Sequence, residues 1–416
     1  MNYYTATLPS GLRVIHQPSA SPVVFCGYVV GGGTRHEQAG EEGLAHFCEH
    51  LSFKGTSRRT AVQILNAIEG VGGELNAYTG KEDTVYYAAI TRDHVRKAVD
   101  VLSDLVFCSE YPQHELEKEC EVVCDEIESY EDSPSELIFD DFENLLFKSH
   151  PLGHNILGTA EQVRSYRSDD ARRFTARYYR PENAVFFASG DLDFRQLLKW
   201  LGAMAPVAVT TPVASASGAI ASIAPIAPIA PTSPPEPVIL HRNTHQAHVM
   251  VGTLAYAATD PRRWALYLLN NLLGGPSMNS RLNLALRERN ALVYTVESQM
   301  TCYSDTGAWS VYFGCDPADV KRCLRLVRRE LDRLMQTQLT TTQLARAKQQ
   351  LHGQIAIAAE NREQAAIEFG RYFLHEGRER HLSELLAHID ALTAHDLQLT
   401  AQELFSEDRI QVLVYN

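Results

Sequence analysis

The sequence contains no apolar run of about 18 residues, the length that a helix needs to cross a bilayer. Its first residues, Met-Asn-Tyr-Tyr-Thr, lack the basic stretch and apolar core of a secretory signal. We therefore expect no membrane partner and a cytoplasmic location. Basic residues are fewer than acidic ones. The chain has 38 Lys and Arg and 51 Asp and Glu, which gives a net charge of −13. This deficit argues against a nucleic-acid partner, whose phosphates need cationic contacts. Basic peptides suit an acidic surface, although such charge more often serves solubility alone.

Cysteine pairs with redox or metal-binding spacing are also missing. The eight cysteines contain no C-x-x-C, so we expect reduced thiols packed in the core. The glycine triplet at 31–33 is not followed by the G-x-x-x-x-G-K-[ST] pattern of a phosphate loop, and we interpret it as the end of a strand. With 416 residues, 45% of them apolar and 21% charged, the chain is long enough for two or three globular domains.

One stretch carries recognisable chemistry, the H-x-x-E-H pattern of His46, Glu49 and His50. A helix turns about 100° per residue, so the two histidines lie roughly 40° apart with the glutamate beside them. Apolar side chains occupy the opposite side of this helix and would anchor it: Leu44, Phe47, Cys48 and Leu51. This geometry suits two Zn²⁺ ligands and a general base. The alternative is an ordinary amphipathic helix with two histidines, and the motif alone does not decide between them.

A third ligand is expected in the acidic stretch 112–130, which has the periodicity of a helix. Its buried stripe recurs every 3.6 residues: Leu116, Cys120, Val123, Cys124 and Ile127. Glu119 and Glu126 flank this stripe, two turns apart, and are the main candidates to face another element. Glu115 is a weaker third candidate. Helical phase leaves the choice among them open.

A second pair of histidines with i, i+4 spacing occurs at His150 and His154. Pro151 and Gly153 lie between them and disfavour a helix, so the two imidazoles would not share one face. We therefore do not interpret this pair as a metal site.

The Pro/Ala-rich stretch 205–239 divides the chain, because such a composition cannot build a core and favours an extended spacer. We expect a zinc-binding catalytic domain at 1–204 and a second domain at 240–416. The predicted strands are Leu12–Ile15, Val23–Val30, Glu74–Thr79, Thr84–Ile90, Ala184–Ser189 and Ile410–Val414. The predicted helices after the motif helix are Ala61–Glu69, Asp93–Phe107, Pro112–Tyr130 and Ala160–Tyr178.

The second half repeats the pattern of the first. Asp83-Thr84 opens an apolar strand that is followed by a helix, and so does Asp305-Thr306. We infer two similar, duplicated α+β domains with antiparallel-rich sheets and helices packed on them. The second domain offers Trp264-Ala-Leu-Tyr-Leu-Leu-Asn-Asn where the first has its motif helix, so it lacks metal ligands there and would support the first.

Several ordered blocks resemble the pitrilysin/insulinase family of zinc peptidases, in a short-chain branch similar to the mitochondrial processing peptidase β subunit. The blocks are Gly43–Thr56, Gly72–Thr79, Glu119–Ile127, His150–Gly158, Tyr179–Asn183, Leu273–Leu282 and Arg287–Tyr294. They span nearly the whole chain apart from the Pro-rich linker. Pro276 and Ala291 stand where glycine is usual in the family, and the linker is longer than expected.

The resemblance implies a role for each site residue. His46, His50 and Glu126 would bind one Zn²⁺ per chain, Glu49 would be the base, and Glu119 would orient a ligand from the outer shell. In the same family the substrate pairs with an edge strand that carries Asn76 and Ala77. The resemblance assigns Arg287 and Tyr294 to the substrate and the developing oxyanion.

The implied fold is two α+β domains that face each other as a clamshell around a chamber. The implied activity is hydrolysis of internal bonds in unfolded peptides small enough to enter that chamber. The alternative is a non-catalytic or partner-dependent subunit of a complex similar to the processing peptidases. Such subunits usually lack part of the His/Glu set, which this chain keeps. Either a homodimer or a heterodimer with a related chain is possible on this reading.

Overall fold

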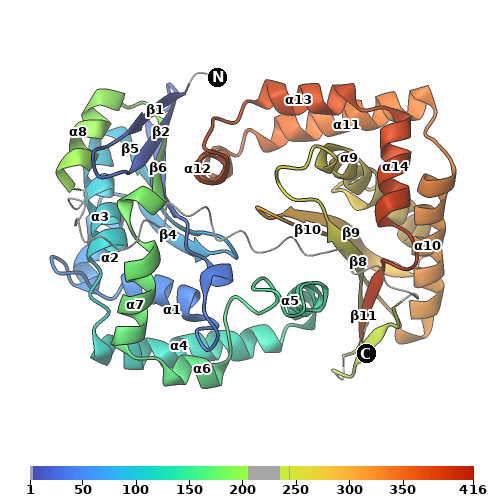
Figure 1. Ribbon diagram of the computed structural model, residues 1–416, viewed down its shortest axis with the longest axis horizontal. Coiled ribbons are helices and arrows are strands. Elements are labelled where there is room, and N and C mark those ends of the chain that lie inside the picture. The colour runs from blue at the N-terminus through green and yellow to red at the C-terminus, as the bar shows by residue number, and fades with distance from the viewer. Residues whose placement is uncertain (1–2, 205–234, 243) are drawn as a thin grey trace. The chain divides into compact units, whose positions relative to one another are not determined.

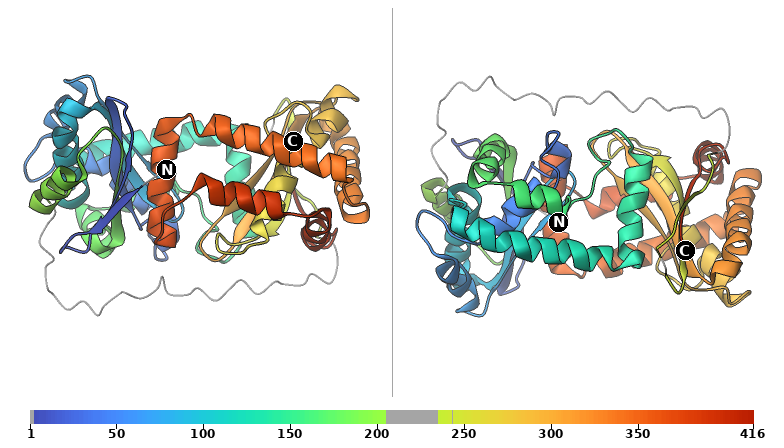
Figure 2. Two further views of the ribbon diagram at one scale, coloured as in Figure 1. Left: turned by 90° about the horizontal axis from the view of Figure 1, so that it is seen from above. Right: turned by 90° about the horizontal axis from the view of Figure 1, so that it is seen from below.

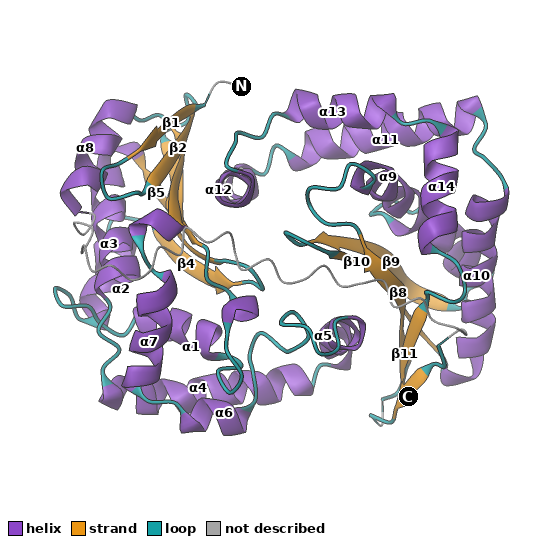
Figure 3. Ribbon diagram, in the orientation of Figure 1, coloured by secondary structure: helices purple, strands orange, loops and turns teal. Residues whose placement is uncertain are grey.

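The computed structural model describes residues 3–204, 235–242 and 244–416. Most of the predicted linker, residues 205–234, therefore lies outside the described residues. The chain forms two compact units, each a β-sheet with helices packed on it (Figure 1, Figure 3). This confirms the predicted fold class of two α+β domains. In the described part of the chain, no helix is both long and apolar enough to span a membrane.

The first unit has a six-stranded sheet in the order β1-β2-β6-β3-β5-β4. Its strands are β1 (Tyr4–Thr7), β2 (Arg13–Pro18), β3 (Val23–Val30), β4 (Glu74–Thr79), β5 (Thr84–Thr91) and β6 (Ala184–Gly190). All neighbouring strands are antiparallel except β2 and β6. Every residue of β6 is buried, which is typical of a strand covered on both faces of its sheet. The strand β4 lies at one edge.

The helices of the first half of the chain cover one face of this sheet and build the main core. They are α1 (Leu44–Ser52), α2 (Ala61–Glu69), α3 (Val95–Cys108), α4 (Gln113–Glu131), α6 (Ala160–Ser165), α7 (Ser168–Tyr178) and α8 (Phe194–Met204). The prediction of one helix over 160–178 was wrong. The chain breaks at Tyr166, and α7 begins afresh where the Asp170 carboxylate accepts a hydrogen bond from the backbone N–H of Arg167.

The second unit has a five-stranded sheet in the order β7-β11-β8-β10-β9. Its strands are β7 (Val238–Leu240), β8 (Ala247–Ala255), β9 (Val293–Cys302), β10 (Gly307–Cys315) and β11 (Gln411–Tyr415). Its helices are α9 (Arg263–Gly274), α10 (Val320–Gln336), α11 (Thr341–Ala358), α13 (Leu382–Ala391), α14 (Ala394–Leu404) and the π-helix η4 (Asn283–Glu288). Short 3₁₀ helices in the two units are Thr34–His36, Arg92–His94, Pro181–Asn183 and Pro317–Asp319.

The two sheets share one topology, which supports the predicted duplication. In each sheet a parallel pair, β2 with β6 or β7 with β11, is followed by three antiparallel pairings. The repeated Asp-Thr pairs precede equivalent strands, β5 and β10, and a long helix follows each of these strands. The eight cysteines are free thiols, and six of them are buried.

Each unit also contains one helix from the other half of the sequence. The segment Tyr130–Lys148, with α5 (Pro134–Leu146), groups with the second unit, and Ala358–His381, with α12 (Arg362–Glu376), groups with the first. Figure 2 shows α12 along the first sheet, where it contacts β2, β3 and β6. The contiguous division at 204 and 240 predicted from the sequence does not include this exchange. The physical reason is that both faces of each sheet are apolar and need a cover.

The helix α12 is held by apolar contacts and by one buried ion cluster. Phe369 and Phe373 pack on the face of the sheet opposite to the main core. Asp83 is fully buried and accepts hydrogen bonds from Nε of Arg371 at 2.9 Å and from Nε2 of His375 at 2.8 Å. Burial alone would raise the pKa of Asp83, but the hydrogen bonds from His375 and Arg371 outweigh burial and hold this pKa below its ordinary value.

We expect Asp83→Asn to loosen α12 by about 2 kcal/mol, because it removes the buried anion that accepts hydrogen bonds from Arg371 and His375. Hydrogen exchange of the α12 amides measures this local opening directly. Asp93→Asn is the control, because Asp93 is exposed on the surface. Since the Asp83 pKa is depressed, its stabilisation is present above the unfolded value of about 3.9 and is lost as the pH falls below it. Equal α12 protection in both variants would contradict this role.

Candidate metal centre

The N-terminus of α1 is fixed by a tight backbone contact and a buried carboxylate. Gly43 has a φ of +89°, and a Cβ atom there would come within 2.5 Å of the Leu157 carbonyl oxygen, so only glycine fits. The Glu37 carboxylate accepts hydrogen bonds from the backbone N–H groups of Gly43, at 3.0 Å, and of Ala45, at 2.7 Å. His154 Nε2 donates to the same carboxylate at 2.9 Å. His154 therefore orients a helix cap, which agrees with its exclusion as a metal ligand.

The two faces of α1 separate packing from chemistry, as the helical pattern predicted. Four apolar side chains are completely buried and fix the helix: Leu44, Phe47, Cys48 and Leu51. The imidazoles of His46 and His50 lie on the other side, with ring centroids 4.6 Å apart. His46 is 6% exposed, so its ring has little freedom to move away. The histidines are thus held together before any ligand arrives.

Helix α4 lies beside α1 (Figure 1). Its Glu126 adds a carboxylate to the two imidazoles. Oε2 of Glu126 is 3.7 Å from Nε2 of His46 and 3.4 Å from Nε2 of His50. The three donor atoms lie within 4.8 Å of one another, and no other group of three possible metal ligands occurs among the described residues. Two imidazole nitrogens and one carboxylate oxygen are a donor set that Zn²⁺ accepts in catalytic sites. The residues therefore fit a zinc ion.

Glu119 holds His50 from behind. It is 5% exposed, and its Oε1 accepts a hydrogen bond from Nδ1 of His50 at 3.0 Å, which turns Nε2 towards Glu126. Burial alone would lower the pKa of His50, but the hydrogen bonds to Glu119 and Glu126 raise it to about 9. Lys54 forms an ion pair with the other oxygen of Glu119. Lys54 was not among the predicted site residues, although its position four residues after His50 was an available signal.

Glu115 has a different setting. It pairs with Lys118 at 2.8 Å in the first turn of α4 and does not belong to the group of possible ligands. The stripe predicted for this helix is buried as expected: Leu116, Cys120, Val123, Cys124 and Ile127.

Glu49 is a buried carboxyl group beside the histidines. It is 8% exposed, and its Oε2 accepts a hydrogen bond from the Thr79 hydroxyl at 3.2 Å. Burial raises the pKa of Glu49 to about 7, while the charge of His50 lowers it and that of Glu126 raises it. A carboxyl group with a pKa near neutrality is able both to accept and to release a proton.

The edge strand β4 leads to this carboxyl group. Thr79 is its last residue, and Asn76 and Ala77 precede it in register with Tyr87 and Tyr86 of β5. In the described residues, no strand pairs with the other side of β4. Free N–H and C=O groups on such an edge are able to pair with an extended peptide.

Arg287 and Tyr294 lie in the second unit and are close to each other. The Arg287 guanidinium carbon is 5.5 Å from the centroid of the Tyr294 ring. Arg287 is in η4, and Tyr294 is 80% exposed near the start of the edge strand β9. An arginine and a tyrosine paired in this way offer hydrogen-bond donors to an anionic group. Their assignment to the substrate stays a prediction.

Two family models match successive parts of the chain. A family model described as Insulinase (Peptidase family M16) matches residues 13–160, and a model described as Peptidase M16 inactive domain matches residues 165–351. A protein of Streptomyces coelicolor named uncharacterized zinc protease is 34% identical over 407 residues, covering 96% of this chain and 86% of that protein. The uncharacterized zinc protease YmxG of Bacillus subtilis is 31% identical over 413 residues, covering 98% and 97%.

Solved structures share the fold at lower identity. A protease from Helicobacter pylori has a TM-score of 0.88 at 20% identity, covering 100% of this chain and 99% of that chain. A structure described as the peptidase M16 inactive domain from Pseudomonas fluorescens has a TM-score of 0.87 at 18% identity, covering 100% and 98%. At these identities the likeness extends to the fold and no further.

Proposed function

Because this chain belongs to the insulinase family of peptidases, family M16, we propose that it is a zinc-dependent endopeptidase that hydrolyses internal bonds of unfolded peptides. The observation that carries the proposal is the convergence of His46, His50 and Glu126 next to the buried carboxyl group of Glu49. The names of the relatives from Streptomyces and Bacillus support zinc as the metal and a peptide as the substrate.

Different residues of the first unit would bind the metal, transfer the proton and position the proton-transferring group. Nε2 of His46, Nε2 of His50 and Oε2 of Glu126 would hold one zinc ion per chain. Bound zinc would supply Lewis-acid chemistry at the scissile carbonyl and at a water molecule. Glu49 accepts the proton of the attacking water on its carboxylate and passes it to the leaving amine. Its partner Thr79 keeps the carboxylate in place through these transfers.

The substrate would bind as an additional strand on the free edge of β4. Backbone pairing along Asn76 and Ala77 does not depend on side chains, so it suits peptides of varied sequence. It requires an extended chain, which a folded protein does not offer. The acidic balance of the whole chain favours basic peptides. Arg287 and Tyr294 would contact the substrate from the second domain. The proposal includes a chamber between the two domains that would enclose the peptide.

The test combines a metal assay with peptide cleavage on the purified chain. We expect one zinc per chain, cleavage of a quenched fluorescent peptide, loss of cleavage with a chelator and recovery on adding zinc. Absence of both zinc and cleavage would contradict the proposal and favour a non-catalytic subunit. Zinc without cleavage, followed by cleavage when a related chain is added, would indicate a partner-dependent subunit. Native mass measurement separates monomer, homodimer and heterodimer.

We expect Glu119→Gln to weaken zinc binding about 10- to 100-fold, because a carboxamide holds the His50 ring less firmly and leaves Lys54 without its anion. Zinc affinity is measured by competition with a chromophoric chelator. Glu115→Gln is the matched control on the same helix, since Glu115 pairs only with surface groups. Equal zinc affinity in both variants would remove Glu119 from the centre.

A further inference from the structure

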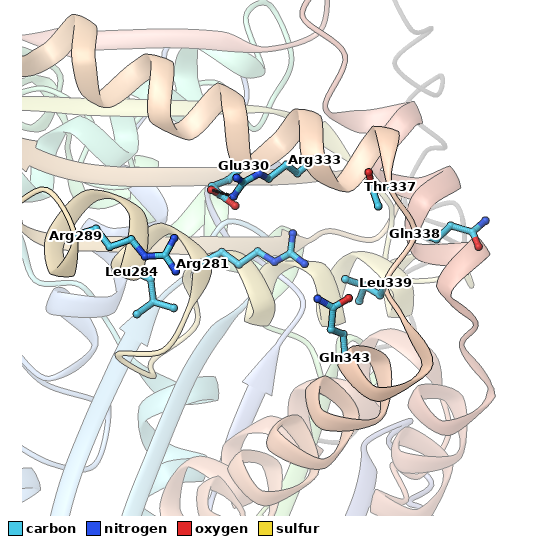
Figure 4. Close-up of a pocket in the computed structure, with 9 residues that line it drawn as sticks. All are labelled: Arg281, Leu284, Arg289, Glu330, Arg333, Thr337, Gln338, Leu339 and Gln343. Carbon is cyan, nitrogen blue, oxygen red and sulfur yellow. Dashed lines mark hydrogen bonds and ion pairs between the residues drawn. The ribbon is translucent and has the colours of Figure 1, made fainter.

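The second unit contains a cavity of about 390 Å³ that none of the proposed peptidase residues lines (Figure 4). Its walls come from η4 and the residues on either side of it, from α10, from the segment after α10 and from the first turn of α11. The lining residues are Arg281, Leu284, Arg289, Glu330, Arg333, Thr337, Gln338, Leu339 and Gln343. Most of these side chains are polar, and arginine is the commonest among them.

The charges of the cavity do not balance. Three guanidinium groups face a single carboxylate, that of Glu330. Glu330 is 4% exposed, and its Oε1 accepts a hydrogen bond from Nη1 of Arg333 at 2.8 Å, so this pair is internally neutralised. For Arg281 and Arg289, no carboxylate oxygen of the described residues lies within 4.0 Å. Two positive charges thus remain, in a chain whose overall charge is −13.

Arg281 is the more unusual of these two cations. It is only partly exposed, and burial lowers the pKa of its guanidinium, while the charge of Glu330 raises this pKa without a direct ion pair and that of Arg333 lowers it. A cation removed from water normally has an anionic partner, because the lost hydration is otherwise not replaced. Leu284 and Leu339 add apolar walls, which strengthen electrostatic attraction inside the cavity. These features indicate an anion-binding site.

The size and donors of the cavity select the kind of anion. A volume of about 390 Å³ lies within the range of about 300–1,000 Å³ that is typical of small-molecule sites, and it exceeds the needs of one small ion. Guanidinium forks match phosphate oxygens in bidentate pairs, and the Thr337 hydroxyl adds a further donor. We propose that this cavity binds a small ligand with linked phosphate groups, of the di- or triphosphate class.

The ligand would connect two elements of the second unit. Arg281 and Arg289 stand just before and just after η4, whereas Thr337 directly follows the last residue of α10. A bound polyphosphate would therefore bridge both ends of η4 to α10 and slow the exchange of amide hydrogens in Asn283–Glu288. This effect does not depend on peptidase activity.

The test is calorimetric titration of the full chain with pyrophosphate and triphosphate at low salt. We expect saturable binding, an at least tenfold loss of affinity in Arg281→Gln and in Arg289→Gln, and unchanged affinity in Arg325→Gln. Arg325 is the control because it is exposed on α10 and does not line the cavity. Repeating the titration in Glu126→Gln excludes zinc chelation as the source of heat. Arg289 is exposed, so its variant keeps the test valid if Arg281→Gln fails to fold.

Two results would overturn the proposal. One is the absence of saturable binding by the unaltered chain. The other is an equal loss of affinity in Arg325→Gln and Arg289→Gln, which would mean attraction by surface charge alone. A parallel titration with adenosine triphosphate separates two sources of the same chemistry. Tighter binding than triphosphate assigns a nucleotide, and equal binding assigns inorganic polyphosphate; both support the site.

Discussion

The variant Glu49→Gln is expected to lower kcat by about 10²- to 10⁴-fold and to leave the zinc content unchanged. The carboxamide cannot accept the proton of the attacking water, but its oxygen still accepts the hydrogen bond from the Thr79 hydroxyl. The side chain keeps its volume in a site where Glu49 is 8% exposed, so the fold does not need to adjust. Because the ligands lie on other residues, metal binding and turnover separate in this variant.

The measurement pairs zinc analysis with single-turnover cleavage of a fluorescent peptide. The matched control is Glu69→Gln, a carboxylate exposed at the end of α2. Its turnover is expected to equal that of the unaltered chain. Cleavage by Glu49→Gln at the unaltered rate would show that another group transfers the proton, and the mechanism would have to be reassigned.

Much of this site was predictable, because helical phase is a local property. The sequence pattern around His46 and His50 predicted one apolar and one chemical face of α1, and both faces occur as expected. Phase also singled out Glu119 and Glu126 on α4 from a helix crowded with acidic residues. In the structure both carboxylates reach His50, one at each ring nitrogen. Periodicity identified the side chains that face a neighbour, but it carried no information on which ring nitrogen each would meet.

Packing between distant parts of the chain was harder to predict from the sequence. The pattern of an amphipathic helix says that one face is buried, but not which sheet covers it, and so the exchange of α5 and α12 between the units was not predicted. The strand β6 could have indicated the exchange. Its residues are buried on both faces of the sheet, so the second face needed an additional helix to cover it. In the ion cluster, Asp83 pairs with Arg371 and His375, which lie 288 and 292 positions further along the chain. No local sequence pattern reports contacts over such a separation.

Glu126→Gln is expected to cause the largest loss of zinc among the variants proposed, well above the 10- to 100-fold expected for Glu119→Gln. A neutral amide oxygen replaces the only anionic donor of the three, so the site loses the negative charge that attracts the metal cation. Glu126 has a side chain 45% exposed, so the substitution does not disturb the core. Activity should fall with the metal and return only in part at high zinc concentration.

Two readouts make this result specific. Zinc stabilises the native chain by an amount that rises with the logarithm of the zinc concentration over Kd, so at one fixed zinc concentration the increase in Tm should be much smaller in Glu126→Gln. Glu128→Gln, two residues further along α4 and exposed, should keep both the Tm increase and the activity. Helical phase alone left Glu119 and Glu126 as the two main candidates for the third ligand, with Glu115 a weaker third. If Glu119→Gln lost its zinc and Glu126→Gln kept it, the two roles would be reversed. The geometry predicts the opposite order, because Oε2 of Glu126 is the carboxylate oxygen that faces both Nε2 atoms.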